Sequence, residues 1–234
     1  MKIASPWQWQ THAVLASTQD AAIEAARAGQ TGRLAILAAS QTAGRGRAGR
    51  AWIAPEGNLN LSVMLRRSRH AMQPGRWALV AGLALQSALS PHAAGILLKW
   101  PNDVLLDGAK LGGILIDSQM GQGGLFDWIV IGFGANLAQA PAIAGRRTVH
   151  LVGSAPMPRM IAESVVASLD DWASADMEDI RDAWLARAHP VGTMLNVQTP
   201  SAHLKGAFAG LAPGGELLLS GRGEPISSAE IGLC

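Results

Sequence analysis

The segment GILLKWPNDVLLDGAKLGGILID, residues 95–117, decides the fold class. Its apolar runs are typical of strands, and Pro101 interrupts them with a turn. The dipeptide Asp107-Gly108 is typical of two-residue hairpin loops, which need backbone conformations that Asp and Gly tolerate. The segment therefore predicts a strand, a proline-containing turn and a β-hairpin.

Charged residues and glycines lie close to this turn. With a two-residue loop, Leu105 pairs with Lys110, and Asp103 lies diagonally across from Lys110 at roughly 7–8 Å. A carboxylate and an ammonium group at that spacing leave room for a phosphate or a metal ion. Gly112 and Gly113 remove side chains where a ligand could approach the backbone. A solvated hairpin with an ordinary surface ion pair explains the segment equally well.

The sequence around this hairpin alternates between strand and helix patterns, which predicts an α/β fold with a mixed sheet. Strands are expected over 33–40, 58–67 and 125–136, and helices over 17–29, 74–90, 157–174 and 176–188. After residue 189, short strand-like runs are separated by Gly- and Pro-containing turns. We therefore expect a main domain over 1–189 and a small β-barrel-like domain over 190–234.

Composition excludes several classes of protein. The chain has 234 residues, of which 49% are apolar and 15% charged, so it can bury a sizeable core. A net charge of +2 gives little support to nucleic-acid binding. No apolar run is long enough to span a membrane, and the N-terminus lacks the apolar core of a signal peptide. The lone cysteine, Cys234, cannot form an internal disulfide, which fits a reducing compartment, so we expect a cytoplasmic protein. The histidines lack the spacing of zinc ligands, so we expect no structural zinc site.

A second unusual segment is QTAGRGRAGRAW, residues 41–52, which follows the predicted strand 33–40. Its arginines, Arg45, Arg47 and Arg50, carry planar cationic groups suited to carboxylate and phosphate oxygens. The glycines between them expose backbone N–H groups. No Gly-Lys-Ser/Thr follows, so the segment is not a P-loop. It reads either as a solvated basic loop or as a clamp that becomes ordered around an anion.

Four motifs in this order resemble the biotin protein ligases, which are biotin–[acetyl-CoA-carboxylase] ligases. They are GRGRAGRAW (44–52), KWPND (99–103), KLGGIL (110–115) and IVIGFGANL (129–137). The resemblance runs from about Ser17 to the end of the chain, where ISSAEI (226–231) is a looser match. It implies a mixed sheet with packed helices, followed by a small SH3-like barrel.

The resemblance also implies an activity. Such an enzyme joins biotin and ATP into biotinyl-5′-adenylate, releases pyrophosphate, and transfers biotin to a lysine of a biotin carboxyl carrier protein. ATP is the co-substrate, and Mg²⁺ is the expected metal ion. The first step brings a carboxylate against a phosphate, so electrostatic stabilisation and positioning are the main demands.

Matching the motifs position by position implies roles for particular residues. The catalytic positions are Lys110, Arg47 and Asp103, with Asp103 also a possible Mg²⁺ ligand. The biotin positions are Ser17, Thr18, Gln19, Gln41, Arg45, Gly46, Arg47, Lys110 and Gly113. The nucleotide positions are Arg45, Arg47, Lys99, Asn102, Asp103, Gly134 and Asn136. The family usually has STN where this chain has STQ, so Gln19 places its amide differently.

Simpler interpretations exist for some of these residues. Ser17 and Thr18 are competent helix caps, Gln41 suits a surface loop, and Lys99 suits the end of a strand. Trp100 and Trp52 are more typical of a core or an anchor than of a ligand platform.

Alternative functions also follow from related folds. One is a lipoate or octanoate ligase, and another is a biotin-binding sensor without catalysis. Only 16 residues precede Ser17, too few for a helix-turn-helix domain, so we expect the monofunctional type without DNA binding. A homodimer is compatible with the sequence, but no feature selects it over a monomer.

Overall fold

The computed structural model describes residues 6–66, 74–121, 126–153 and 155–233, so Cys234 lies outside the described residues. The chain divides into two compact units. The first comprises residues 1–72 and 111–163, and the second comprises residues 73–110 and 164–234.

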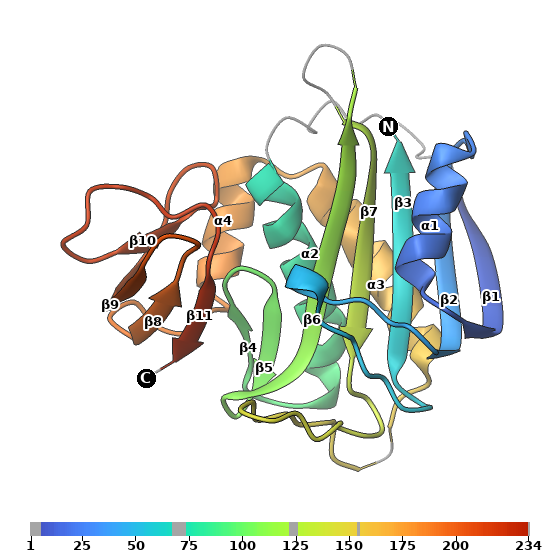
Figure 1. Ribbon diagram of the computed structural model, residues 1–234, viewed down its shortest axis with the longest axis horizontal. Helices are drawn as coiled ribbons and strands as arrows, with labels where there is room; N and C mark the ends of the chain where they lie inside the picture. Colours follow the sequence, from blue (N-terminus) through green and yellow to red (C-terminus); the bar gives the residue numbers. More distant parts are fainter. Residues whose placement is uncertain (1–5, 67–73, 122–125, 154, 234) are drawn as a thin grey trace. The chain divides into compact units, whose positions relative to one another are not determined.

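The first unit is built on a mixed sheet with strand order β1-β2-β3-β7-β6 (Figure 1). The strands are β1 (Trp7–Leu15), β2 (Arg33–Gln41), β3 (Leu59–Arg66), β7 (Phe126–Ala135) and β6 (Ala109–Met120), the last from Leu111 onward. β1 pairs with β2 in parallel, whereas the other neighbours are antiparallel. The predicted mixed sheet is therefore confirmed. β1 was not predicted, although WQWQ alternates apolar and polar residues as a strand does.

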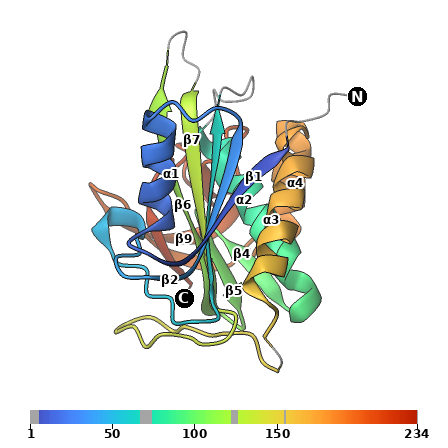
Figure 2. The same cartoon turned by 90° about the vertical axis from the view of Figure 1, so that its right-hand side faces the viewer.

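Helix α1 (Thr18–Arg27) covers one face of this sheet (Figure 2). Ser17 caps the helix, since its side chain accepts a hydrogen bond from the Asp20 amide, and Gly29 follows it with a φ of 84°. The buried face of the helix packs with strand residues into one apolar cluster, comprising Ala22, Ile23, Ala26, Leu34, Ile36, Met64, Trp128 and Val130. The predicted helix is confirmed together with its cap.

The sheet face under α1 changes from apolar to polar along β3. Leu59, Leu61 and Val63 share the opposite face of β3, because successive side chains of a strand point to opposite faces. The intervening residues Asn60 and Ser62 are also buried, with 1% and 0% of their surface exposed. Buried polar side chains need hydrogen-bond partners, so this part of the sheet is built around a polar network.

The second unit combines helices with a hairpin. Its helices are α2 (Pro74–Leu89), α4 (Met177–Leu185) and the part of α3 (Pro158–Ala173) from residue 164 onward, and a short 3-10 helix spans Ser90–His92. α2 packs against α4 and against the strands β4 (Ile96–Lys99) and β5 (Asp103–Leu106). Asp107 and Gly108 have φ values of 51° and 71°, which confirms the predicted two-residue turn. No helix among the described residues is long and apolar enough to cross a membrane.

The C-terminal part of the second unit is a small antiparallel sheet with strand order β10-β9-β8-β11. Its strands are β8 (Met194–Gln198), β9 (His203–Leu211), β10 (Leu217–Leu219) and β11 (Glu230–Leu233). The predicted small β element is confirmed. The described strand pairings form an open series, since β10 continues only into an isolated bridge between Leu217 and Ile226. A closed barrel is therefore not part of the described structure.

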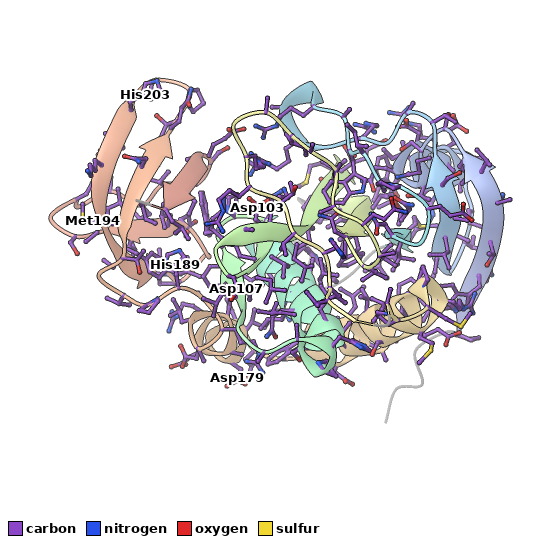
Figure 3. The ribbon with its side chains drawn as sticks, turned by 90° about the horizontal axis from the view of Figure 1, so that it is seen from below. Asp103, Asp107, Asp179, His189, Met194 and His203 are labelled. Atoms are coloured by element: carbon purple, nitrogen blue, oxygen red, sulfur yellow. The ribbon has the colours of Figure 1, made fainter. Side chains whose placement is uncertain are left out.

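We expect the stability of the second unit to depend on pH through His189. Its ring lies edge-on to Phe208 with 4.5 Å between centroids, and only 4% of the residue is exposed. His189 is labelled in Figure 3. Burial lowers the pKa of His189, and the charge of Lys99 lowers it further. Between this lowered pKa and the ordinary value near 6.5, the unfolded chain binds a proton that the folded chain does not. Stability therefore rises with pH in that range.

We expect His189→Phe to reduce this pH dependence. The phenyl ring keeps the contact with Phe208 but cannot bind a proton. Urea unfolding at about pH 5.5 and about pH 8 should show a smaller difference in unfolding free energy for the variant than for the wild type. An unchanged difference would mean that other groups cause the pH dependence.

Candidate active site

The first unit holds a chain of polar side chains between α1 and the ends of β2 and β3. Gln41 Oε1 accepts hydrogen bonds from the Thr18 amide at 2.7 Å and the Thr18 hydroxyl at 3.1 Å. The Thr18 hydroxyl also lies 2.9 Å from the Ser62 hydroxyl. Gln41 Nε2 donates to Asn60 Oδ1 at 3.0 Å. The sequence-predicted residues Thr18 and Gln41 are thus brought together, and Asn60 and Ser62 join them as residues that the prediction missed.

Gln19 is a fully engaged member of this polar chain. Its Nε2 donates to Asp117 Oδ2 at 2.9 Å and to the Val130 carbonyl at 3.3 Å, and its Oε1 accepts from Ser62 at 3.1 Å. A Cβ atom at Gly132 would lie 2.5 Å from Gln19 Oε1. The longer amide of Gln19 therefore fits because β7 has no side chain at this point.

Arg45 connects the arginine loop, residues 41–52, to this chain of polar side chains. Arg45 Nη1 lies 2.6 Å from Asp20 Oδ1, and Arg45 Nη2 lies 3.6 Å from Asp117 Oδ2. Asp117 thus contacts both Arg45 and Gln19. Because the Arg45 side chain is 39% exposed, these ion pairs contribute little to stability, but they hold its guanidinium at the edge of the polar chain.

The rest of the loop forms a compact turn. Arg45 and Ala51 form an isolated antiparallel bridge, and the Gly46 amide donates to the Arg50 carbonyl at 2.7 Å. A short 3-10 helix, η1 (Arg47–Gly49), begins at Arg47, whose side chain is half-buried.

Gly134 allows the indole of Trp52 to lie directly on β7. A Cβ atom at Gly134 would lie 2.3–2.7 Å from three ring atoms of Trp52. Gly113 pairs with Gly134 across β6 and β7, so two strands lack side chains at the same level. The group that approaches the backbone of Gly134 in this structure is Trp52 at the end of the arginine loop, and the approach of a ligand to these glycines stays a prediction.

Asn136 follows β7 and is 2% exposed. Its backbone N–H donates to the Leu111 carbonyl at 2.8 Å, and its side-chain Nδ2 donates to the Val149 carbonyl at 3.0 Å. These contacts fix the segment that leaves the sheet beside the two glycines. The resemblance assigns Asn136 to the nucleotide, but in this structure its Nδ2 group already donates a hydrogen bond to the Val149 carbonyl.

The second unit brings together three charged residues of the hairpin region. Lys110 Nζ lies 2.5 Å from Asp103 Oδ1, and Lys99 Nζ lies 2.9 Å from Asp103 Oδ2. The side chains of Lys99, Asp103 and Lys110 are 14%, 10% and 13% exposed (Asp103 is labelled in Figure 3). Asn102 lies in the turn just before Asp103 and is half-buried.

The charge of Asp103 is fixed by this arrangement. Burial alone would raise the pKa of its carboxyl group, but the ammonium groups of Lys110 and Lys99 outweigh that effect and lower the pKa to about 2. The prediction of a gap between the charged groups of Asp103 and Lys110 is wrong. The long lysine side chain extends along the diagonal, so its ammonium group contacts the carboxylate. One buried carboxylate thus holds two ammonium groups in place.

Asp103 does not fit a magnesium ligand in this arrangement. Both of its oxygens lie within 2.9 Å of ammonium groups, and a metal cation there would be repelled by two positive charges. The described residues also contain no group of three or more His, Cys, Asp or Glu side chains that could hold a metal ion.

The sequence carried a signal for some of the missed residues. Asn60 and Ser62 alternate with leucine and valine in the otherwise apolar segment 59–65. Polar residues in such a strand indicate a buried polar network. Asp20 and Asp117 had no local signal, because their partners are 25 and 98 residues away in the chain.

Comparison with known proteins shows the family of this chain. Residues 12–136 match the Biotin/lipoate A/B protein ligase family. A biotin–[acetyl-CoA-carboxylase] ligase of Paracoccus denitrificans is 36% identical over 87% of this chain and 91% of its own. One of Mycobacterium tuberculosis is 32% identical over 82% and 76%. The biotin protein ligase of Aquifex aeolicus in complex with biotin and ATP shares the fold, with a TM-score of 0.78, 23% identity and coverage of 98% and 99%. The chain belongs to the biotin/lipoate A/B protein ligase family.

Proposed function

We propose that this protein is an ATP-dependent biotin–[acetyl-CoA-carboxylase] ligase. The two relatives described above carry that name, and the likeness extends over most of both chains. The observation that carries the proposal is the buried pair of Lys110 and Asp103. It presents an oriented ammonium group at a motif position of the family, and adenylate formation needs such a group.

The reaction has two steps. A biotin carboxylate oxygen attacks the α-phosphorus of ATP, the bond to the bridging oxygen breaks, and pyrophosphate leaves. The amine of a carrier-protein lysine then attacks the carbonyl carbon of the adenylate, loses a proton and expels AMP. Cationic groups favour the first step because two anions must approach each other. We assign this role to Lys110, Arg47 and Arg45.

The polar chain of the first unit is the proposed site for the biotin ring. A cyclic urea has both N–H donors and a carbonyl acceptor, and Thr18, Gln41 and Asn60 offer both kinds of partner. The dithiolane ring of lipoate and the alkyl chain of octanoate have neither N–H donors nor a carbonyl acceptor to pair with these side chains. This favours biotin over lipoate or octanoate. We assign Ser17, Gln19, Gly46 and Gly113 to the same biotin site.

We assign the nucleotide to Asn102, Gly134 and Asn136, which occupy motif positions of the family. Mg²⁺ would come with the phosphates of ATP, and no step is assigned to a protein-held ion. The proposed acceptor is a lysine of a biotin carboxyl carrier protein. We propose that the protein acts in the cytoplasm, where ATP is available. We assign catalysis to residues 1–189 and propose that 190–234 form a small accessory β domain.

Pyrophosphate release with labelled ATP and Mg²⁺ tests this function. We expect release that depends on biotin, together with transfer of biotin to a carrier domain. Release with lipoate or octanoate but not with biotin would identify the alternative ligase. Tight biotin binding without turnover would identify a sensor.

A further inference from the structure

Leu98 and the first two residues of the KWPND motif, Lys99 and Trp100, donate hydrogen bonds to carbonyl groups beyond residue 186. The Leu98 amide donates to the Arg187 carbonyl at 2.8 Å. Lys99 Nζ donates to the Ile231 carbonyl of β11 at 2.9 Å, and Trp100 Nε1 donates to the Gly215 carbonyl at 3.0 Å. All of these residues belong to the second unit.

Lys99 has a special place in this series because its ammonium group makes two different contacts. One is the hydrogen bond to the Ile231 carbonyl, and the other is the ion pair with Asp103 Oδ2 at 2.9 Å. An ammonium group has three donors, so these two contacts use most of its capacity. Asp103 in turn holds Lys110 through its other oxygen. The contacts therefore run from β11 through Lys99 and Asp103 to Lys110.

The charges of this cluster do not balance within it. Two ammonium groups share one carboxylate, and all three side chains are at most 14% exposed. A buried excess of positive charge is unfavourable unless the groups are held by further hydrogen bonds or joined by an anion. The Ile231 carbonyl supplies such a hydrogen bond to Lys99, so the position of Lys99 depends on β11 as well as on Asp103.

We propose that Lys99 is a positioning residue that ties strand β11 to Asp103, so that the C-terminal sheet sets the orientation of the Asp103–Lys110 pair. This rests on the proposed ligase function. Lys99 acts through Asp103 and does not bind the nucleotide. The C-terminal sheet thereby contributes to the adenylation step through one side chain.

Replacing Lys99 with methionine tests the proposal, because methionine keeps the apolar stem and removes the ammonium group. We expect kcat for biotin-dependent pyrophosphate release to fall by about 10- to 100-fold, as a catalytic group is displaced. The KM values for biotin and ATP should change less than about threefold, since ground-state binding is not affected. Lys99→Arg keeps the charge and the donors and should recover part of the lost kcat.

A matched control is Lys205→Met, because Lys205 is an exposed lysine on β9 of the same sheet. It should leave kcat and thermal stability unchanged. Hydrogen exchange at residues 230–233 provides a readout that does not need activity, and Lys99→Met should raise it. If the wild type releases no pyrophosphate with biotin, the proposed function fails. The exchange measurement still tests whether Lys99 holds strand β11 in place.

Three outcomes would overturn the proposal. The first is an unchanged kcat in both Lys99 variants. The second is a raised KM for ATP at unchanged kcat, which would make Lys99 a nucleotide ligand. The third is unchanged exchange at residues 230–233 in Lys99→Met.

Discussion

Lys110→Met is expected to lower kcat for adenylate formation by about 100- to 1,000-fold, the usual loss when one oriented donor to a developing anion is removed. Methionine fills a similar volume, so the packing around the hairpin is retained. The variant keeps Asp103 paired with Lys99 but leaves no ammonium group on Asp103 Oδ1. The repulsion between the carboxylate and the α-phosphate then has no compensating charge from this position.

Single-turnover measurement of adenylate formation isolates the step that Lys110 is proposed to serve. Transfer from preformed biotinyl-5′-adenylate to the carrier should be affected much less, because this step does not bring the carboxylate and phosphate together. Thermal unfolding checks that the variant is folded, and Lys205→Met serves again as the lysine control. Adenylate formation at the wild-type rate in folded Lys110→Met would remove Lys110 from the mechanism.

The elements that the sequence predicted well have local causes. The Asp107-Gly108 turn depends on the conformational freedom of two adjacent residues, and the start of α1 depends on Ser17 and the amide three residues later. Strand and helix patterns within 10–20 residues are likewise visible without knowledge of distant contacts. The mixed sheet could therefore be predicted, except for β1, which was not predicted although its WQWQ segment alternates apolar and polar residues.

The site was less predictable because its contacts join distant parts of the chain. The motif positions identified Thr18, Gln41, Arg45 and Lys110, but not what each one touches. The gap expected between Asp103 and Lys110 was based on backbone spacing, and flexible lysine side chains can close such a gap. The partner of Gln19, Asp117, is 98 residues away, and no periodicity connects them.

Gly132→Ala is expected to disrupt the polar chain that is proposed to bind biotin. The new methyl group would lie 2.5 Å from Gln19 Oε1, so the amide must move away from Ser62 and Asp117. Overpacking of this kind typically destabilises a protein by about 1–3 kcal/mol. We expect the KM for biotin to rise by about 10- to 100-fold, which corresponds to about 1.4–2.8 kcal/mol of lost binding.

The double variant Gly132→Ala/Gln19→Asn provides the decisive comparison. Asparagine is one methylene shorter and leaves room for the alanine methyl group, so the double variant should bind biotin better than Gly132→Ala alone. The two substitutions should therefore couple by about 0.5–3 kcal/mol. Gly223→Ala is the matched control, since a Cβ atom there has no neighbour within 4 Å. Strictly additive effects on biotin binding would show that Gly132 and Gln19 act independently, because a shared steric conflict must be relieved when either partner becomes smaller.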